Sequence, residues 1–214
     1  MLQKLVKQKY APLITAILIC LFFFAAYSVL SIVRHLHYGS FGYDLGINNQ
    51  IVWRYSTFQP PITTVGPFPG SLKLATHVEL VYAFITPFYW LWSSSRMLLL
   101  VEAGFLVSGG IAMFLLARER KLTIPISFSI LISYLSFYGL QNAMWFDVHS
   151  ASFGAAFIAW MLYFLNKNSV FGTLLFFFLA ITAKENIAFI TFSLGLVYFI
   201  SRRNKLSLFL MLAS

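Results

Sequence analysis

The sequence predicts an all-α, polytopic bundle of transmembrane helices, with about six spans and the start of a seventh. The first observation is composition, since 60% of the 214 residues are hydrophobic and only 10% are charged. Soluble domains carry roughly a quarter charged residues, so water cannot be the main solvent of this chain. The second observation is a series of long apolar stretches that are separated by basic segments.

Residues 11–33 form the first predicted span. This stretch holds no charged residue and exceeds the roughly 20 residues that a helix needs to cross the hydrocarbon layer. Lysines precede it, as in a secretory signal, but the apolar run is longer than a signal core and more spans follow, which favours a retained anchor. Further predicted spans cover residues 97–117, 124–140, 150–165, 170–183 and 187–200, and residues 206–213 begin another apolar stretch.

Basic residues predict which side of the membrane each loop faces, because cytoplasmic loops collect Lys and Arg. With a cytoplasmic amino terminus, the loops predicted to lie inside hold ten of the fifteen basic residues. These are Lys4, Lys7, Lys9, Arg118, Arg120, Lys121, Lys167, Arg202, Arg203 and Lys205. Orientation and contact with anionic lipid of the bilayer account for the net charge of +9, so we expect no nucleic-acid partner.

Residues 34–96 form the predicted outer loop, which is far longer than any inside loop and is therefore expected to be structured. Asp44 is placed to cap a helix over residues 45–55, whose apolar side chains form one stripe. Residues 78–92 form a second apolar segment with two tryptophans near its end, as is common at the membrane interface. We expect both to be juxtamembrane helices that pack on the outer leaflet.

Titratable side chains gather on the predicted outer face, which holds four of the six acidic residues and all four histidines. Carboxylates near hydrocarbon are costly unless they are paired or hydrated, so they are candidates for function. His77 with Glu79 is one candidate pair, and the alternative for it is simple solvation at the interface. The acidic residues of this face are Asp44, Glu79, Asp147 and Glu185, and the histidines are His35, His37, His77 and His149.

The other candidates also have structural alternatives. Asp44 is either functional or a helix cap. Asp147 and His149 either hold a metal ion or transfer protons, or they belong to a solvated turn. Lys184 and Glu185 lie between two short apolar stretches and either take part in function or form an interfacial ion pair.

Five short motifs follow one another along most of the chain: YDLGINNQIVW at residues 43–53, THVE at 76–79, PFY at 87–89, FDVH at 146–149 and AKEN at 183–186. As an ordered set they resemble the predicted membrane proteins of domain-of-unknown-function family 2079, which look like glycosyltransferases of the GT-C type. The chain departs from the family pattern at Asn48, Asn49, Glu79 and Ser150. These departures concern substrate contacts more than the fold.

The resemblance implies an enzyme that transfers a sugar from a polyprenyl-phosphate carrier to an acceptor outside the cytoplasmic membrane. Asp44 would take the proton of the acceptor hydroxyl or orient that hydroxyl. The departing phosphate needs positive charge, from Lys184, Arg96, a protonated His149 or a divalent metal ion. The expected catalytic residues are Asp44, Lys184 and Glu185; the expected substrate-binding residues are His77, Glu79, Asp147, His149, Arg96 and Trp53, with Asp147 and His149 as metal candidates.

Two other classes of protein remain as alternatives. A transporter would place ionisable residues inside its spans, where Glu102 is the only candidate. A non-catalytic membrane assembly protein would tolerate replacement of Asp44 and Lys184. Because the resembling proteins are longer, we expect residues 1–214 to be one transmembrane domain from the amino-terminal part of a longer bundle, either a fragment or an inactive truncated copy.

Overall fold

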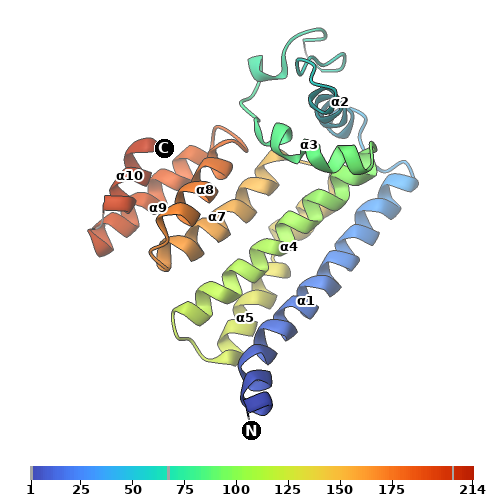
Figure 1. The fold of residues 1–214 in the computed structure, drawn as a ribbon. Coiled ribbons are helices and arrows are strands. Elements are labelled where there is room, and N and C mark those ends of the chain that lie inside the picture. The colour runs from blue at the N-terminus through green and yellow to red at the C-terminus, as the bar shows by residue number, and fades with distance from the viewer. Residues whose placement is uncertain (1, 67, 204) are drawn as a thin grey trace.

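The computed structural model of the chain describes residues 2–66, 68–203 and 205–214. Within these residues the regular structure consists of ten α-helices, one 3-10 turn and one isolated β-bridge. The all-α fold class is thereby confirmed. The helices form a bundle with a cap at one end, and the amino terminus lies at the other end (Figure 1).

Three helices frame one half of the bundle. α1 (Leu2–Leu36) and α4 (Ser95–Glu119) lie side by side, and α5 (Ile124–Leu135) packs against both (Figure 1). A glycine allows close packing here, since a Cβ at Gly109 would lie 3.4 Å from the Ala156 Cα and would collide with the Tyr134 ring. Small residues let membrane helices approach in this way.

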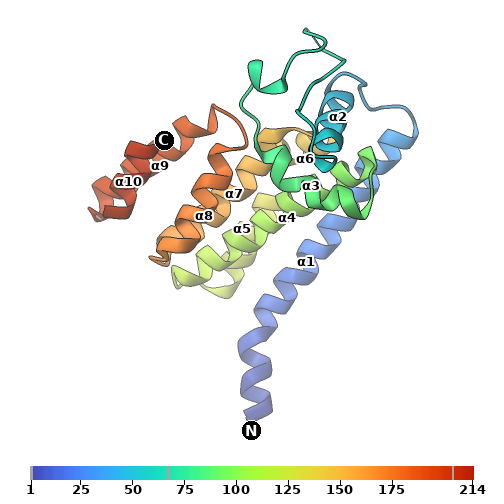
Figure 2. The same ribbon diagram turned by 45° about the horizontal axis from the view of Figure 1, so that its top comes forward.

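The other half contains shorter helices. α7 (Ser150–Asn166) packs between α4 and α8 (Val170–Ile181), and α9 (Ile187–Arg202) packs with α10 (Lys205–Ala213). The turn between α7 and α8 lies away from the cap, whereas the segment between α8 and α9 lies on the cap side (Figures 1 and 2). Residues 182–186 therefore approach the cap, although they lie more than ninety residues beyond α3 (Val81–Leu91), its last helix.

The cap is built from the predicted outer loop. It contains α2 (Asp44–Ser56), the 3-10 turn η1 (Lys73–Ala75) and α3 (Val81–Leu91), with an irregular segment between α2 and η1 (Figure 2). The two predicted helices of this loop are thus confirmed. Buried apolar residues of α2 and α3, such as Ile51 and Tyr82, join one core with α4, α7 and α8, so the cap is fixed to the bundle.

The prediction that Asp44 caps α2 is wrong. Asp44 is itself the first residue of the helix, Tyr43 occupies the capping position in a helical conformation, and no side chain caps the helix. A carboxylate in the first turn is still favourable, because the amino end of a helix carries partial positive charge. The Asp44 carboxylate therefore makes no capping hydrogen bond to the backbone of α2 and can interact with groups beside the helix.

The predicted span over residues 124–140 is interrupted. α5 ends at Leu135, Phe137 is extended, and α6 (Tyr138–Trp145) continues after the break. The carbonyl groups freed by the break are satisfied, because the Tyr27 hydroxyl donates to the Leu135 oxygen and Gln141 Nε2 donates to the Ser136 oxygen at 2.9 Å. Irregular backbone is tolerated at membrane depth when neighbouring groups satisfy it in this way.

Three helical stretches of the described residues are long and apolar enough to cross a membrane: Tyr10–Leu36, Ser95–Glu119 and Ile124–Trp145, the last of which includes the break. Four further apolar helices are shorter. With 12 residues, α8 measures about 18 Å, which is less than the hydrocarbon thickness of about 30 Å. The expectation of six spans stays a prediction.

Candidate functional site

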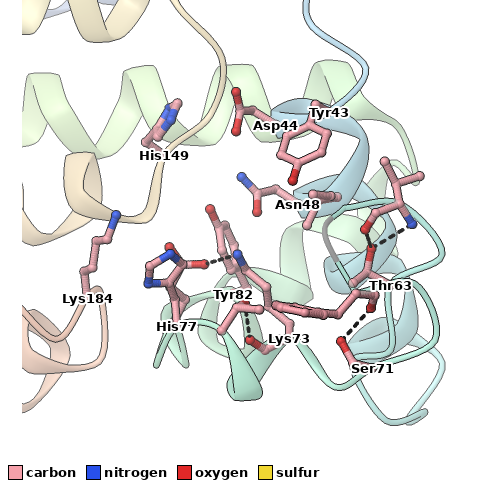
Figure 3. A pocket seen from close by; sticks show the side chains of 15 residues that line it. Tyr43, Asp44, Asn48, Thr63, Ser71, Lys73, His77, Tyr82, His149 and Lys184 are labelled. Atoms are coloured by element: carbon pink, nitrogen blue, oxygen red, sulfur yellow. Dashed lines mark hydrogen bonds and ion pairs between the residues drawn. The ribbon is translucent and has the colours of Figure 1, made fainter.

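A cavity of about 210 Å³ lies where the cap meets α7 and the segment between α8 and α9. Its walls combine three elements of the cap with two distant loops of the bundle. Figure 3 shows Lys184 and His77 on one side of this space and Asp44 and Asn48 on the other. The lining residues are Tyr43, Asp44, Ile47, Asn48, Thr63, Val65, Phe68, Ser71, Lys73, Thr76, His77, Glu79, Tyr82, His149 and Lys184.

The first turn of α2 places Asp44 and Asn48 on the same wall, because residues four apart share one face of a helix. The Asn48 side chain is 7% exposed and donates through Nδ2 to the Val148 oxygen at 2.8 Å. This bond fixes α2 against the loop that carries His149. The apolar residues Leu45 and Val52 of α2 are buried in the core that the cap shares with α4.

The loop over residues 146–149 is held by polar contacts with three helices. Glu102 of α4 accepts a hydrogen bond from the His149 backbone N–H at 3.1 Å, Asn48 of α2 binds the Val148 oxygen, and Arg34 of α1 donates to the Phe146 oxygen at 2.7 Å. His149 Nδ1 lies 2.7 Å from the Asp147 oxygen. Because a carbonyl only accepts, Nδ1 carries the proton, and Nε2 is left as the acceptor of the neutral ring.

A buried ion pair forms the floor on the cap side. Lys73 Nζ lies 3.0 Å from Glu79 Oε2, and the two side chains are 14% and 8% exposed. Ser150 Oγ, at the start of α7, donates to Glu79 Oε1 at 2.7 Å. The pair is thus tied both to the cap and to the bundle, and the charge of Glu79 is largely compensated.

The segment after α8 forms the opposite wall. The Val81 N–H donates to the Thr182 oxygen at 2.9 Å, so α3 begins against the end of α8. His77 Nδ1 lies 2.8 Å from Glu185 Oε1 on the solvent side. The hydrogen bonds that this carboxylate accepts, from its own backbone N–H first and from His77 next, lower the pKa of Glu185. Glu185 therefore remains an anion paired with His77, while Lys184 faces the cavity.

Several predicted site residues come together here, although they lie far apart in sequence. Asp44, His77, Glu79, His149 and Lys184 all line the cavity. Glu185 lies at its edge through the contact with His77. The structure shows where these side chains lie, and the roles assigned to them remain predictions.

Besides Glu185, three predicted residues do not line the cavity. The Asp147 carboxylate is fully buried, forms an ion pair with Arg34 and accepts the Phe41 N–H at 2.7 Å. Arg96 is exposed near the start of α4, and Trp53 is exposed on α2. Among the described residues, no three His, Cys, Asp or Glu side chains are grouped so that they could hold a metal ion. Of the two metal candidates, only His149 retains an uncommitted side-chain atom.

Sequence reasoning missed three lining residues that matter for the chemistry of the cavity: Lys73, Asn48 and Tyr82. Lys73 stands in a polar segment without periodicity, so nothing in the sequence pointed to its partner. Asn48 belongs to the first motif and lies one helical turn after Asp44, and this spacing was the available signal. Tyr82 lies among apolar and aromatic residues and resembles an ordinary core residue there.

The apolar helices and the composition define an integral membrane protein, and the cavity lies in the cap at one end of its bundle. The chain belongs to the family described as predicted membrane protein (DUF2079), whose family model matches residues 34–214. The match begins near the end of α1 and includes the whole cap and all the later helices. No curated protein matches the chain, and no solved structure does.

Proposed function

We propose that this protein is a membrane glycosyltransferase that moves a sugar from a polyprenyl-phosphate donor to an acceptor on the outer face of the cytoplasmic membrane. The observation that carries the proposal is the cavity at the cap, in which Asp44 and Lys184 stand on opposite walls. A carboxylate and an ammonium group that face one space, at the end of a membrane bundle, suit a reaction in which a proton leaves one reactant and an anion leaves the other.

The sidedness of the bundle supports this assignment. The turn between α4 and α5 carries Arg120 and Lys121, follows Arg118 at the end of α4, and lies at the end opposite the cap (Figure 1). Basic loops favour the cytoplasmic side, so we place the cap and its cavity outside. A donor whose lipid tail lies in the membrane would then hold its sugar phosphate at the outer surface, where the cap is.

In the proposed reaction, the bond between the sugar C1 and the phosphate oxygen breaks with its electron pair remaining on the phosphate. The acceptor oxygen forms the new bond to C1, and its proton moves to the Asp44 carboxylate. Lys184 stabilises the phosphate anion that leaves, and Glu185 holds His77 at the edge of the same wall. Oxocarbenium character at C1 makes this substitution similar to other glycosyl transfers.

The free carboxylate of Asp44 supports its role as the proton acceptor. The carboxylate of Asp147 is already committed to Arg34 and Phe41, and that of Glu79 to Lys73 and Ser150. A divalent metal ion would supply additional positive charge at the phosphate if one binds, and His149 is the one of the two metal candidates that lines the cavity.

The test measures transfer of radiolabelled sugar from polyprenyl-phosphate glucose, mannose, galactose and arabinose, in membranes that contain the protein. Replacement of a general base lowers the rate by about 100-fold or more, so Asp44→Asn should reduce transfer by that factor while insertion is unchanged. Glu119→Gln is the matched control, because Glu119 is exposed at the far end of α4. Full activity of Asp44→Asn would remove Asp44 from the mechanism.

Absence of transfer by the natural protein from every carrier would favour the two alternatives. A non-catalytic assembly protein would then be sought through co-purifying membrane partners. A transporter of an unidentified substrate would be sought through uptake into vesicles, with Glu102 as the buried carboxylate to replace first.

A further inference from the structure

The Tyr82 hydroxyl is a buried polar group without a hydrogen-bond partner among the described residues. Tyr82 lies in the first turn of α3, its side chain is 0% exposed, and it lines the cavity. In Figure 3 its hydroxyl points up from the floor toward Asn48. Buried hydroxyl groups are nearly always paired, so an unpaired one that faces a cavity needs a partner inside that cavity.

Ser150 lies next to the Tyr82 hydroxyl, and its backbone and side chain act on the tyrosine oxygen without forming a hydrogen bond of normal geometry. Ser150 Oγ, which lies close to it, is already committed to Glu79 Oε1 at 2.7 Å. Burial first, and the charges of Glu79 and Glu102 next, raise the pKa of Tyr82 well above its ordinary value. The group therefore keeps its proton at every physiological pH and can donate it.

Asn48 supplies the complementary function. Its Nδ2 is committed to the Val148 oxygen, which fixes the orientation of the amide and leaves the Oδ1 oxygen as an acceptor. Asn48 and Tyr82 thus present one acceptor and one donor beside each other on the cavity wall. A sugar hydroxyl both donates and accepts, whereas a phosphate group only accepts and an ammonium group only donates.

We propose that Tyr82 and Asn48 form a hydroxyl-recognition subsite, and that Tyr82 is a specificity-determining residue for a sugar hydroxyl. The inference deepens the proposed function and depends on it, because it identifies which wall receives the sugar and which receives the phosphate. On this wall the charge of Lys73 is already compensated by Glu79, whereas Lys184 on the opposite wall forms no ion pair with a carboxylate of the described residues. The phosphate then occupies the opposite wall beside Lys184.

Stability and binding together test this subsite. Tyr82→Phe removes a hydroxyl that has no partner in the free protein, so the thermal midpoint without ligand should stay unchanged or rise. Tyr89→Phe is the matched control on the same helix, because the Tyr89 hydroxyl donates to Asn49 Oδ1 and its loss should lower the midpoint by about 2–4 °C. A comparable drop for Tyr82→Phe would mean that its hydroxyl serves the fold, and the proposal would fail.

The probes for binding are polyprenyl-phosphate glucose and the same polyprenyl phosphate without sugar. In the natural protein, the glycosylated lipid should raise the thermal midpoint more than the bare lipid does, and Tyr82→Phe should abolish this difference while Tyr89→Phe retains it. In transfer assays Tyr82→Phe should raise KM at least tenfold, in keeping with the loss of one buried hydrogen bond to substrate. Retention of the full difference by Tyr82→Phe would overturn the subsite.

Failure of the proposed function gives a different result. If no sugar is transferred, but the sugar-dependent midpoint shift is present and requires Tyr82, the subsite stands and the catalytic role of Asp44 fails. If transfer depends on Asp44 but not on Tyr82, the proposed function stands and the subsite fails.

Discussion

The His77 imidazole and the Glu185 carboxylate lie 2.8 Å apart and join the segment before α3 to the segment before α9. This contact links residues that are 108 positions apart in the chain. It closes the solvent side of the cavity, since both segments contribute lining residues. Because both side chains are about half exposed, the link is accessible to changes of pH and salt.

The pH dependence of this link has a definite sign. The pKa of Glu185 is lowered below 4.5 by hydrogen bonds to its carboxylate, so its contribution to stability is present above that value and is lost as pH falls through the lowered pKa. The thermal midpoint of the natural protein should exceed that of Glu185→Gln by a small amount above the ordinary carboxylate pKa, and the difference should vanish as pH falls through the lowered pKa. A difference that persists in acid strong enough to protonate every carboxylate would contradict the assignment.

The buried pair of Arg34 and Asp147 gives a prediction for stability. Removal of one partner of a buried ion pair costs about 3–5 kcal/mol, because the other charge stays buried without compensation. The side chains are 9% and 0% exposed, so Arg34→Met should lower the free energy of unfolding in detergent by this amount. Arg34→Met combined with Asp147→Leu should recover much of the loss, although the Phe41 N–H would still lose its acceptor.

The control for this pair is Arg96→Met, since Arg96 is exposed and should change stability by less than about 0.5 kcal/mol. Equal behaviour of the Arg34 and Arg96 variants would show that the buried pair does not stabilise the join between α1 and the loop before α7. The measurement is denaturant unfolding followed by tryptophan fluorescence.

Membrane sidedness is tested by labelling introduced cysteines with a membrane-impermeant maleimide in intact cells. Cys20 is buried and is the only native cysteine, so a Cys20→Ala background is suitable. Thr64→Cys, at an exposed position of the cap, should be labelled from outside, and Lys167→Cys, in the turn between α7 and α8, should not. Outside labelling of position 167 with protection of position 64 would invert the orientation and move the cavity to the cytoplasmic side.

Much of the fold could be predicted because apolar runs and polar interruptions directly set where membrane helices begin and end. The predicted apolar stretches correspond to α1, α4, α5, α7, α8 and α9, and the two cap helices were also predicted. The break at Ser136 and Phe137 could not be predicted, because it contains no Pro or Gly and depends on Tyr27 and Gln141 to satisfy freed carbonyl groups. Those partners become visible only when the helices are packed.

The candidate site shows a similar division. Ionisable residues near apolar segments were conspicuous, and five of the predicted residues line one cavity. The pairing of Asp147 with Arg34 spans 113 positions, so neither the partner nor the burial of the carboxylate could be read from local sequence. The absence of a side-chain cap on α2 could not be predicted either. An aspartate can be the capping residue or the first residue of a helix, and the conformation of the residues before it decides between the two.

The loop over residues 146–149 has a mechanical consequence. Arg34, Asn48 and Glu102 fasten it to three different helices, so its backbone moves only when the bundle itself moves. The entrance for substrates must then lie elsewhere, and the irregular segment between α2 and η1 is one of the other walls, through Thr63 and Val65. It is attached to α2 through Gln50 and Thr64, with the Thr64 N–H 2.9 Å from Gln50 Oε1. We expect the loop that carries His149 to be the fixed part of the cavity lining.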